Sequence, residues 1–234
     1  MAGAVGIALA IAWVAAPASA MPAMPPRFAA LARAAPDLDS PVLALALRAS
    51  ACAKARRLIT SRKLLTIVDY TRSGNDPRLW VLDLERRTLR FQTLVAHGQG
   101  SGELYATDFS NDAGSWQTSL GLFATGEVYD GVHGRSLRLF GLEPRVNDRA
   151  YERALVMHGA DYVSLEFAAI TGRVGRSHGC PALPLAIAPE VIDAIAGGSA
   201  FFAYYPDPDW YASSWLLGAC TAVPTDLTTP VPGQ

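Results

Sequence analysis

The segment GRSHGCPALP (residues 175–184) places Cys180, one of only three cysteines in the chain, between a glycine and a proline. A nucleophilic cysteine needs a reachable thiolate, a base or positive charge beside it, and donors for the oxyanion that it creates. Gly179 allows another backbone to approach closely, and Pro181 biases Cys180 toward an extended conformation. The amides of His178, Gly179 and Cys180 are candidate oxyanion donors. The segment therefore predicts a reactive thiol on a stiff turn.

The base for this thiol is to be found among four histidines, each of which is followed by glycine. His158 ends the apolar run ALVMHG (154–159), so its ring is expected at the end of a well-anchored strand. His133 lies in the turn GVHG and is the competing candidate. His97 opens a long polar loop and is expected to line the cleft. We take His158 as the general base because a strand fixes its ring.

The composition bounds the fold and the partners. The chain has 234 residues, of which 50% are hydrophobic and 18% charged, which predicts one packed domain with appendages. The net charge of −1 gives no reason to expect nucleic acid or an anionic membrane surface as a partner.

The N-terminal segment has the pattern of an export signal. Residues 1–20 are apolar and end in Ala-Ser-Ala, a small-residue cleavage pattern. We therefore expect a signal peptide over 1–20, a linker over 21–40, a single catalytic domain over 41–217 and a flexible tail over 218–234. The expected location is the periplasm or cell envelope, with no membrane span after cleavage.

Export affects how the cysteines are interpreted. In an oxidising compartment an odd number of cysteines leaves at least one free thiol. Cys52 and Cys220 lie near opposite ends and could pair, leaving Cys180 free. The alternative is that both are small buried apolar residues.

Strand-like runs dominate the remaining sequence. Periodicity and turn residues predict a β-rich domain with few helices. The expected helices cover 41–58 and 188–198, with a helical turn over 147–154 capped by Asn147. A polar loop over 98–119 is long enough to be functional. The expected strands are 64–70, 78–84, 88–97, 120–130, 135–142, 154–159 and 199–205.

Two separated stretches together resemble a known catalytic signature. VMHGADYVS (156–164) and GRVGRSHGCPALP (172–184) resemble the signature of the L,D-transpeptidases of bacterial cell walls. Residues 106–143, together with GRSHGCPALP, more specifically resemble the murein L,D-transpeptidase catalytic-domain (YkuD-like) branch. The resemblance runs from about Leu64 to Tyr205. It implies a mainly β, sandwich-like fold, here with an N-terminal helix appended.

The resemblance also implies a mechanism that uses neither metal nor cofactor. Cys180 would attack the carbonyl of the third residue of a peptidoglycan stem tetrapeptide, a meso-diaminopimelate centre, and expel D-alanine. His158 would carry the protons, and the Gly159 carbonyl would orient its ring. The amides of Gly179 and Cys180 match the family's oxyanion donors. A stem-peptide amine, a wall-attached protein or water would then resolve the thioester.

The chain departs from the family pattern after the cysteine. An arginine usually follows within two residues, whereas Pro181-Ala182 stands here. Arg176 or Arg173 are candidates to replace it. We expect four residues to contact the substrate: Arg176, Ser177, His133 and His97.

Other functions remain open at this stage. An L,D-carboxypeptidase would use the same cysteine with water as the acceptor. A zinc hydrolase is disfavoured, because the histidines lack the short spacings of common zinc sites. A non-catalytic wall-binding module would use aromatic residues as its binding surface: Phe109, Trp116, Phe123 and Tyr129.

Overall fold

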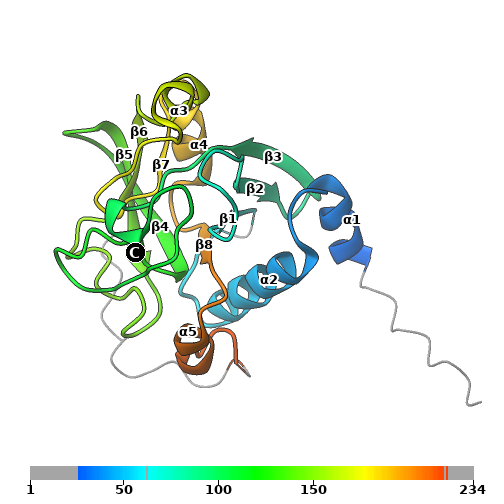
Figure 1. The fold of residues 1–234 in the computed structure, drawn as a ribbon. Coiled ribbons are helices and arrows are strands. Elements are labelled where there is room, and N and C mark those ends of the chain that lie inside the picture. The colour runs from blue at the N-terminus through cyan, green and yellow to red at the C-terminus, as the bar shows by residue number, and fades with distance from the viewer. Residues whose placement is uncertain (1–25, 62, 219, 221–234) are drawn as a thin grey trace, which may run out of the picture.

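The computed structural model describes residues 26–61, 63–218 and 220 (Figure 1). The predicted signal peptide, residues 1–20, lies outside this range, as do residues 221–234 of the predicted tail. None of the helices within the described part is long and apolar enough to span a membrane.

Two helices precede the sheet. α1 spans Pro26–Ala34 and α2 spans Ser40–Ala55. Proline stands in the first turn of α2, where its missing N–H has no intrahelical acceptor to lose. The linker expected over 21–40 is wrong for its described part: α1 buries Leu31 completely and packs on β3 (Thr88–Thr93). This stretch is therefore folded onto the domain.

Eight strands form one continuous sheet in the order β3-β2-β1-β8-β4-β5-β6-β7. Neighbours are antiparallel except for the pairs β1–β8 and β6–β7, which are parallel. Ala96, just after β3, bridges Ala182 in β7, so the two edges of the sheet meet and the sheet is barrel-like. The predicted mainly β fold is confirmed. The strands not yet bounded are β1 Leu64–Asp69, β2 Leu79–Asp83, β4 Gly121–Gly131, β5 Gly134–Gly141, β6 Val156–Ala160, β7 Ala182–Pro184 and β8 Ala200–Tyr204.

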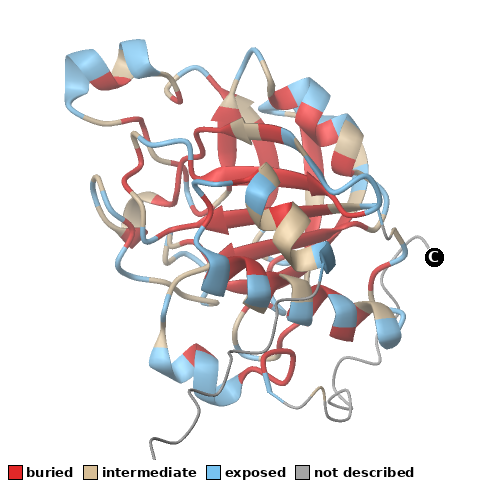
Figure 2. Cartoon of the chain, turned by 90° about the vertical axis from the view of Figure 1, so that its right-hand side faces the viewer, coloured by how far each residue is buried: buried red, intermediate tan, exposed pale blue. Residues whose placement is uncertain are grey.

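The core lies between this sheet and the helices. Every residue of β2, and all but the first of β1, is buried. α2 packs on β1 and β8, while α4 (Ala188–Ile195) packs on β5 and β6. Figure 2 shows the strands mostly buried and the helices exposed on their outer faces. Strands that are covered on both faces favour continuous apolar runs. The runs at 64–70 and 78–84 therefore identify these two strands from the sequence.

Three short elements were not predicted: α3 (Leu165–Thr171), β7 and α5 (Pro208–Ser213). Each is too short to show a hydrophobic period. The expected helical turn over 147–154 is a series of hydrogen-bonded turns. Asn147 does not cap it, because its side chain is buried and bonds to the backbone of Leu120, Leu122 and Glu143.

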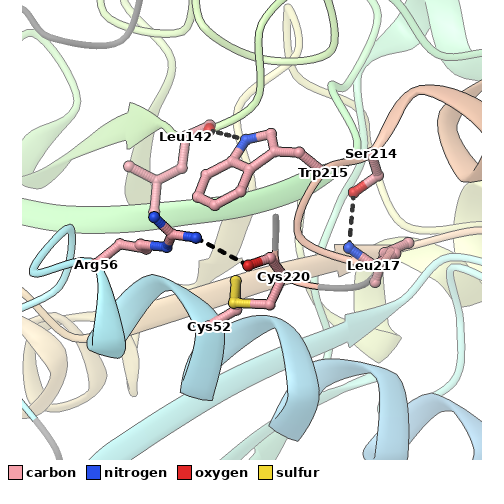
Figure 3. Close-up of a disulfide and its surroundings, with 7 residues drawn as sticks. All are labelled: Cys52, Arg56, Leu142, Ser214, Trp215, Leu217 and Cys220. Atoms are coloured by element: carbon pink, nitrogen blue, oxygen red, sulfur yellow. Dashed lines mark hydrogen bonds between the residues drawn. A yellow bond between two sulfur atoms is a disulfide. The ribbon is translucent and has the colours of Figure 1, made fainter. Parts of the chain in front are cut away.

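A disulfide joins the two ends of the domain. Cys52 on α2 is bonded to Cys220, beyond α5, so the predicted flexible tail is anchored at its start (Figure 3). Arg56 donates a hydrogen bond to the Cys220 carbonyl. Of the two alternatives for these cysteines, the paired one is therefore observed, and Cys180 is free.

Candidate active site

The pairing of β6 with β7 brings the two principal candidates together. In this parallel pair His158 stands opposite Ala182, two residues after Cys180. Cys180 thus lies at the end of the sheet where β6 begins. On its other side β6 pairs with β5, where Ser136 stands opposite His158.

Hydrogen bonds within the cysteine turn hold its shape. The Gly179 amide donates to Ser177 Oγ at 3.0 Å, and the Ser177 hydroxyl donates to the Cys180 carbonyl at 2.6 Å. Gly179 has φ +120°, and a Cβ there would lie 2.7 Å from the Gln117 carbonyl oxygen. Only glycine fits this position without strain. The Gly179 amide, expected as an oxyanion donor, is occupied by Ser177 in this structure.

The Cys180 thiol is half-buried and faces the start of β6. Its sulfur accepts from the Val156 amide at 3.5 Å and donates to the Ala154 carbonyl at 3.8 Å. Burial raises the pKa of this thiol, while the Val156 amide and the charge of Arg153 act in the opposite direction. The resting side chain is therefore a neutral thiol directed at backbone atoms rather than at the His158 ring.

His158 is held in one tautomer. Its Nδ1 lies 3.0 Å from the Gly159 carbonyl oxygen, which can only accept, so Nδ1 carries the proton and Nε2 keeps its lone pair. Burial lowers the pKa of His158, so the ring is neutral at rest. The His133 ring, from the exposed β4–β5 turn, stacks on it at 4.4 Å. Both candidate bases thus lie in one stack, and the Gly159 carbonyl contacts the His158 ring.

His97 is in a structural position rather than at the substrate. Its side chain is 1% exposed, and its Nδ1 accepts from Arg78 Nη2 at 2.7 Å, so the proton is on Nε2, near the Gly102 carbonyl. Burial and Arg78 lower the pKa of His97 to about 3. The expectation that it lines the cleft is therefore wrong: its ring anchors the start of the 98–119 loop.

Two other residues that were predicted to contact the substrate, Ser177 and Arg176, make intramolecular contacts that hold the loops in place. Ser177 is buried within the cysteine turn. Arg176 donates to the carbonyls of Gln99 and Gly102 and pairs with Glu103 at 2.8 Å. Arg173 pairs with the same carboxylate, also at 2.8 Å. Of the four residues predicted to contact the substrate, only His133 is exposed, and its ring lies against that of His158.

Sequence reasoning missed Arg153, which lies in the turn before β6. Its guanidinium contacts the 98–119 loop and lies beside Gly179. No sequence signal singled it out, because an arginine in a polar turn normally faces solvent. Trp116, considered only for a wall-binding module, stacks on His178 at 4.9 Å. Among the residues that the structure describes, no group of three or more His, Cys, Asp or Glu side chains is placed to hold a metal ion.

Several solved structures are similar to this chain at low identity. An L,D-transpeptidase from Mycobacterium smegmatis is 11% identical with a TM-score of 0.38, covering 61% of this chain and 59% of that one. One from Xylanimonas cellulosilytica DSM 15894 is 16% identical (TM-score 0.37, 62% of each chain). One from Mycobacterium tuberculosis H37Rv is 14% identical (TM-score 0.36, 61% and 58%). The chain thus covers less than two thirds of each. No curated protein matches it significantly.

The family comparison is more extensive. A family model described as the L,D-transpeptidase catalytic domain matches residues 34–204, which is more than half of the chain. The matched range contains the sheet, the cysteine turn and the strand that carries His158. The chain therefore belongs to the family of L,D-transpeptidase catalytic domains.

Proposed function

We propose that this protein is a peptidoglycan L,D-transpeptidase that works through a thioester on Cys180. The observation that carries the proposal is the β6–β7 pairing, which brings the one free cysteine of the described chain to the same end of the sheet as a strand-borne histidine whose Nε2 keeps its lone pair. Membership of the L,D-transpeptidase family supports peptidoglycan as the substrate.

The first half of the proposed reaction forms the thioester. The Cys180 side chain turns toward His158, whose Nε2 takes the thiol proton. The sulfur attacks the carbonyl carbon of the meso-diaminopimelate residue, and the carbonyl oxygen becomes an oxyanion. The Cys180 and His178 amides are its proposed donors, together with the Gly179 amide once that is released from Ser177. Collapse breaks the C–N bond to D-alanine, and the imidazolium protonates the departing amine.

The second half transfers the acyl group. An acceptor amine attacks the thioester carbon, a C–N bond forms, and the C–S bond breaks. The amine proton passes through His158 to the sulfur, which restores the thiol. With water as the acceptor the product is a carboxylate, and the protein is a carboxypeptidase. A wall-attached protein supplying the amine is the third case.

The resting charges favour general-base catalysis over a preformed ion pair. Burial raises the pKa of the Cys180 thiol and lowers that of the His158 imidazole, so both are neutral before attack. A neutral imidazole is the form able to accept the thiol proton. The proton is therefore transferred during attack on the carbonyl.

The decisive experiment is covalent labelling followed by turnover. The folded wild-type protein is incubated with a carbapenem, a class that acylates this family, and its mass is measured. We expect one adduct, absent from Cys180→Ala, and release of D-alanine from a tetrapeptide muropeptide. An adduct that survives Cys180→Ala, or muropeptide binding without turnover, contradicts the proposal, and the second result favours the wall-binding module.

A comparison of two histidine variants identifies the base. His158→Ala is expected to abolish D-alanine release, whereas His133→Ala keeps a measurable rate because the exposed His133 only stacks on the ring. Their pH–rate profiles distinguish the roles. Full activity in His158→Ala would reverse the assignment.

We also propose that the protein is exported to the periplasm or cell envelope. Residues 1–20 have a signal-peptide pattern, and the Cys52–Cys220 disulfide is typical of oxidising compartments. Fractionation of cells that produce the full-length chain tests this, and the mature N-terminus is expected near Met21.

A further inference from the structure

Arg153 makes an unusual set of contacts for a turn residue. Its Nη1 donates to the Ser110 carbonyl at 2.7 Å and to Ser119 Oγ at 2.6 Å. Its Nη2 donates to Ser115 Oγ at 3.2 Å and to the Gln117 carbonyl at 2.7 Å. All four acceptors belong to one segment, residues 110–119. A single half-buried guanidinium therefore attaches this segment to the start of β6.

The same guanidinium lies against the cysteine turn. A Cβ built on Gly179 would be 3.5 Å from Arg153 Nη2. The residue after Arg153, Ala154, has φ +53° and presents its carbonyl to the Cys180 thiol. An alanine in this left-handed conformation is strained, which indicates that the surrounding contacts hold the turn in place. Arg153 and Ala154 thus form one wall of the thiol environment.

Within the described part of the chain no carboxylate contacts Arg153, although the charge of Asp112, on the segment that Arg153 holds, raises the pKa of the guanidinium. Among the ion pairs of the described residues, Arg173 and Arg176 share Glu103, and Arg149 contacts Asp112 and Glu152. Arg153 has only neutral acceptors. Because charge interactions are stronger away from water, this half-buried cation affects a neighbouring sulfur more than an exposed one would. Its charge lowers the pKa of the Cys180 thiol.

The segment held by Arg153 carries an exposed aromatic residue. Trp116 lies between the two contacted residues Ser115 and Gln117, is 51% exposed, and stacks on His178. It has φ +55°, and its carbonyl accepts from the Gly100 amide at 2.9 Å. The indole is therefore held in one orientation beside the cysteine turn.

We propose that Arg153 is a positioning residue of the acyl-transfer reaction, which holds segment 110–119 against the cysteine turn and supplies the positive charge that favours the Cys180 thiolate. The inference rests on the proposed function in one respect, that Cys180 is the nucleophile. It adds a residue from a distant turn to the site.

The other titratable groups around Cys180 do not interfere with a measurement of the thiol's pH dependence. Tyr70 follows β1 and Tyr162 follows β6, and burial raises the pKa of each to about 12. The lowered pKa of His158, on β6, keeps its ring neutral above pH 7. His178, on the thiol's own turn, stacks on Trp116. Between pH 7 and pH 10 Arg153 is therefore the cation in the described structure whose charge acts on the Cys180 sulfur.

The test is the pH dependence of Cys180 alkylation by iodoacetamide in the unreduced full-length protein, where the other two cysteines are blocked by their disulfide. Arg153→Met is expected to raise the thiol pKa and to slow alkylation at pH 8 by about tenfold, which corresponds to one pKa unit. Arg153→Lys keeps the charge and is expected to alkylate within about twofold of the wild type. Its D-alanine release nevertheless falls, because lysine cannot make the forked contacts.

Arg149→Met is the matched control, because Arg149 lies on the same turn but is exposed and paired with carboxylates. Its alkylation profile is expected to match the wild type. A wild-type profile in Arg153→Met overturns the inference, as does an equal shift in Arg149→Met. If Arg153→Met does not fold, Arg153→Gln replaces it.

Alkylation requires no peptidoglycan. A shift in a protein that releases no D-alanine therefore contradicts the proposed function but not the effect of Arg153 on the thiol. An unshifted profile in an active transpeptidase contradicts the inference alone.

Discussion

Removal of the disulfide is expected to destabilise the domain more than any single surface change. Cys52 lies on α2, and Cys220 follows a buried C-terminal run: Trp215, Leu216 and Leu217. The bond ties this run to the first half of the chain (Figure 3). The double variant Cys52→Ser, Cys220→Ser breaks the tie and leaves Cys180 untouched.

The size of the effect follows from the length of chain that the bond closes. The two cysteines are separated by 168 residues. The loop-entropy relation gives about 5 kcal/mol of stabilisation at 25 °C for a loop of this length. Compact denatured states reduce this value, so we expect a loss of about 3–5 kcal/mol.

Urea denaturation at pH 7 without reductant measures the loss. The double variant is expected to unfold at lower urea and with a steeper slope, because its denatured state, without the crosslink, exposes more surface. Reduced wild-type protein is expected to approach it. Cys180→Ser controls for the loss of a thiol and should keep the wild-type midpoint. Equal midpoints for the wild type and the double variant would refute the reasoning, since they would mean that the bond adds nothing to the folded state.

Three further changes test the framework of the site. The folded pKa of His97, about 3, lies below its ordinary value of 6.5, so the unfolded chain binds this proton more strongly between those pH values. His97 therefore makes stability fall as the pH drops from 6.5 toward 3, by up to about 1.4 kcal/mol per unit. The urea midpoints at pH 7 and pH 4 should differ less in His97→Gln than in the wild type. An equal difference in the two proteins would contradict this account. Gly179→Ala places a Cβ 2.7 Å from the Gln117 carbonyl at φ +120°. This variant should lose about 1–3 kcal/mol of unfolding free energy, and its rate of Cys180 alkylation by iodoacetamide should change. Unchanged values of both would show that the turn is not constrained. Glu143 is 1% exposed and accepts from Leu122 N, Trp210 Nε1 and Ser214 Oγ. Glu143→Ala should cost about 3 kcal/mol or more in urea unfolding because three donors lose their acceptor, and a loss below about 1 kcal/mol would contradict that account.

The parts of the fold that were predictable are those with a local signal. The buried runs at 64–70 and 78–84 and the hairpin around His133 are apolar or alternating over enough residues to identify strands. β7 has three residues and ends in a proline, so it shows no period of its own. It is a strand only because β6 pairs with it and Ala96 bridges it from the other edge of the sheet.

The histidines show, for the site, the same limit of prediction from local sequence. All four are followed by glycine, so their local sequences are nearly alike. In the structure His97 is buried against Arg78, His133 stacks on His158, and His178 stacks on Trp116. Each environment is made by residues distant in sequence, which local sequence does not reveal.

The amino-acid sequence alone predicts a β-rich domain, a cysteine on a glycine–proline turn and a histidine at the end of a strand. Each of these is a local property of a few consecutive residues. Tertiary structure decided which two histidines remain accessible, which two cysteines pair, and that Arg153 lies beside the cysteine turn. Burial and charge at a point in space depend on chain segments that meet only after folding, and these two quantities determine the ionisation of the sulfur.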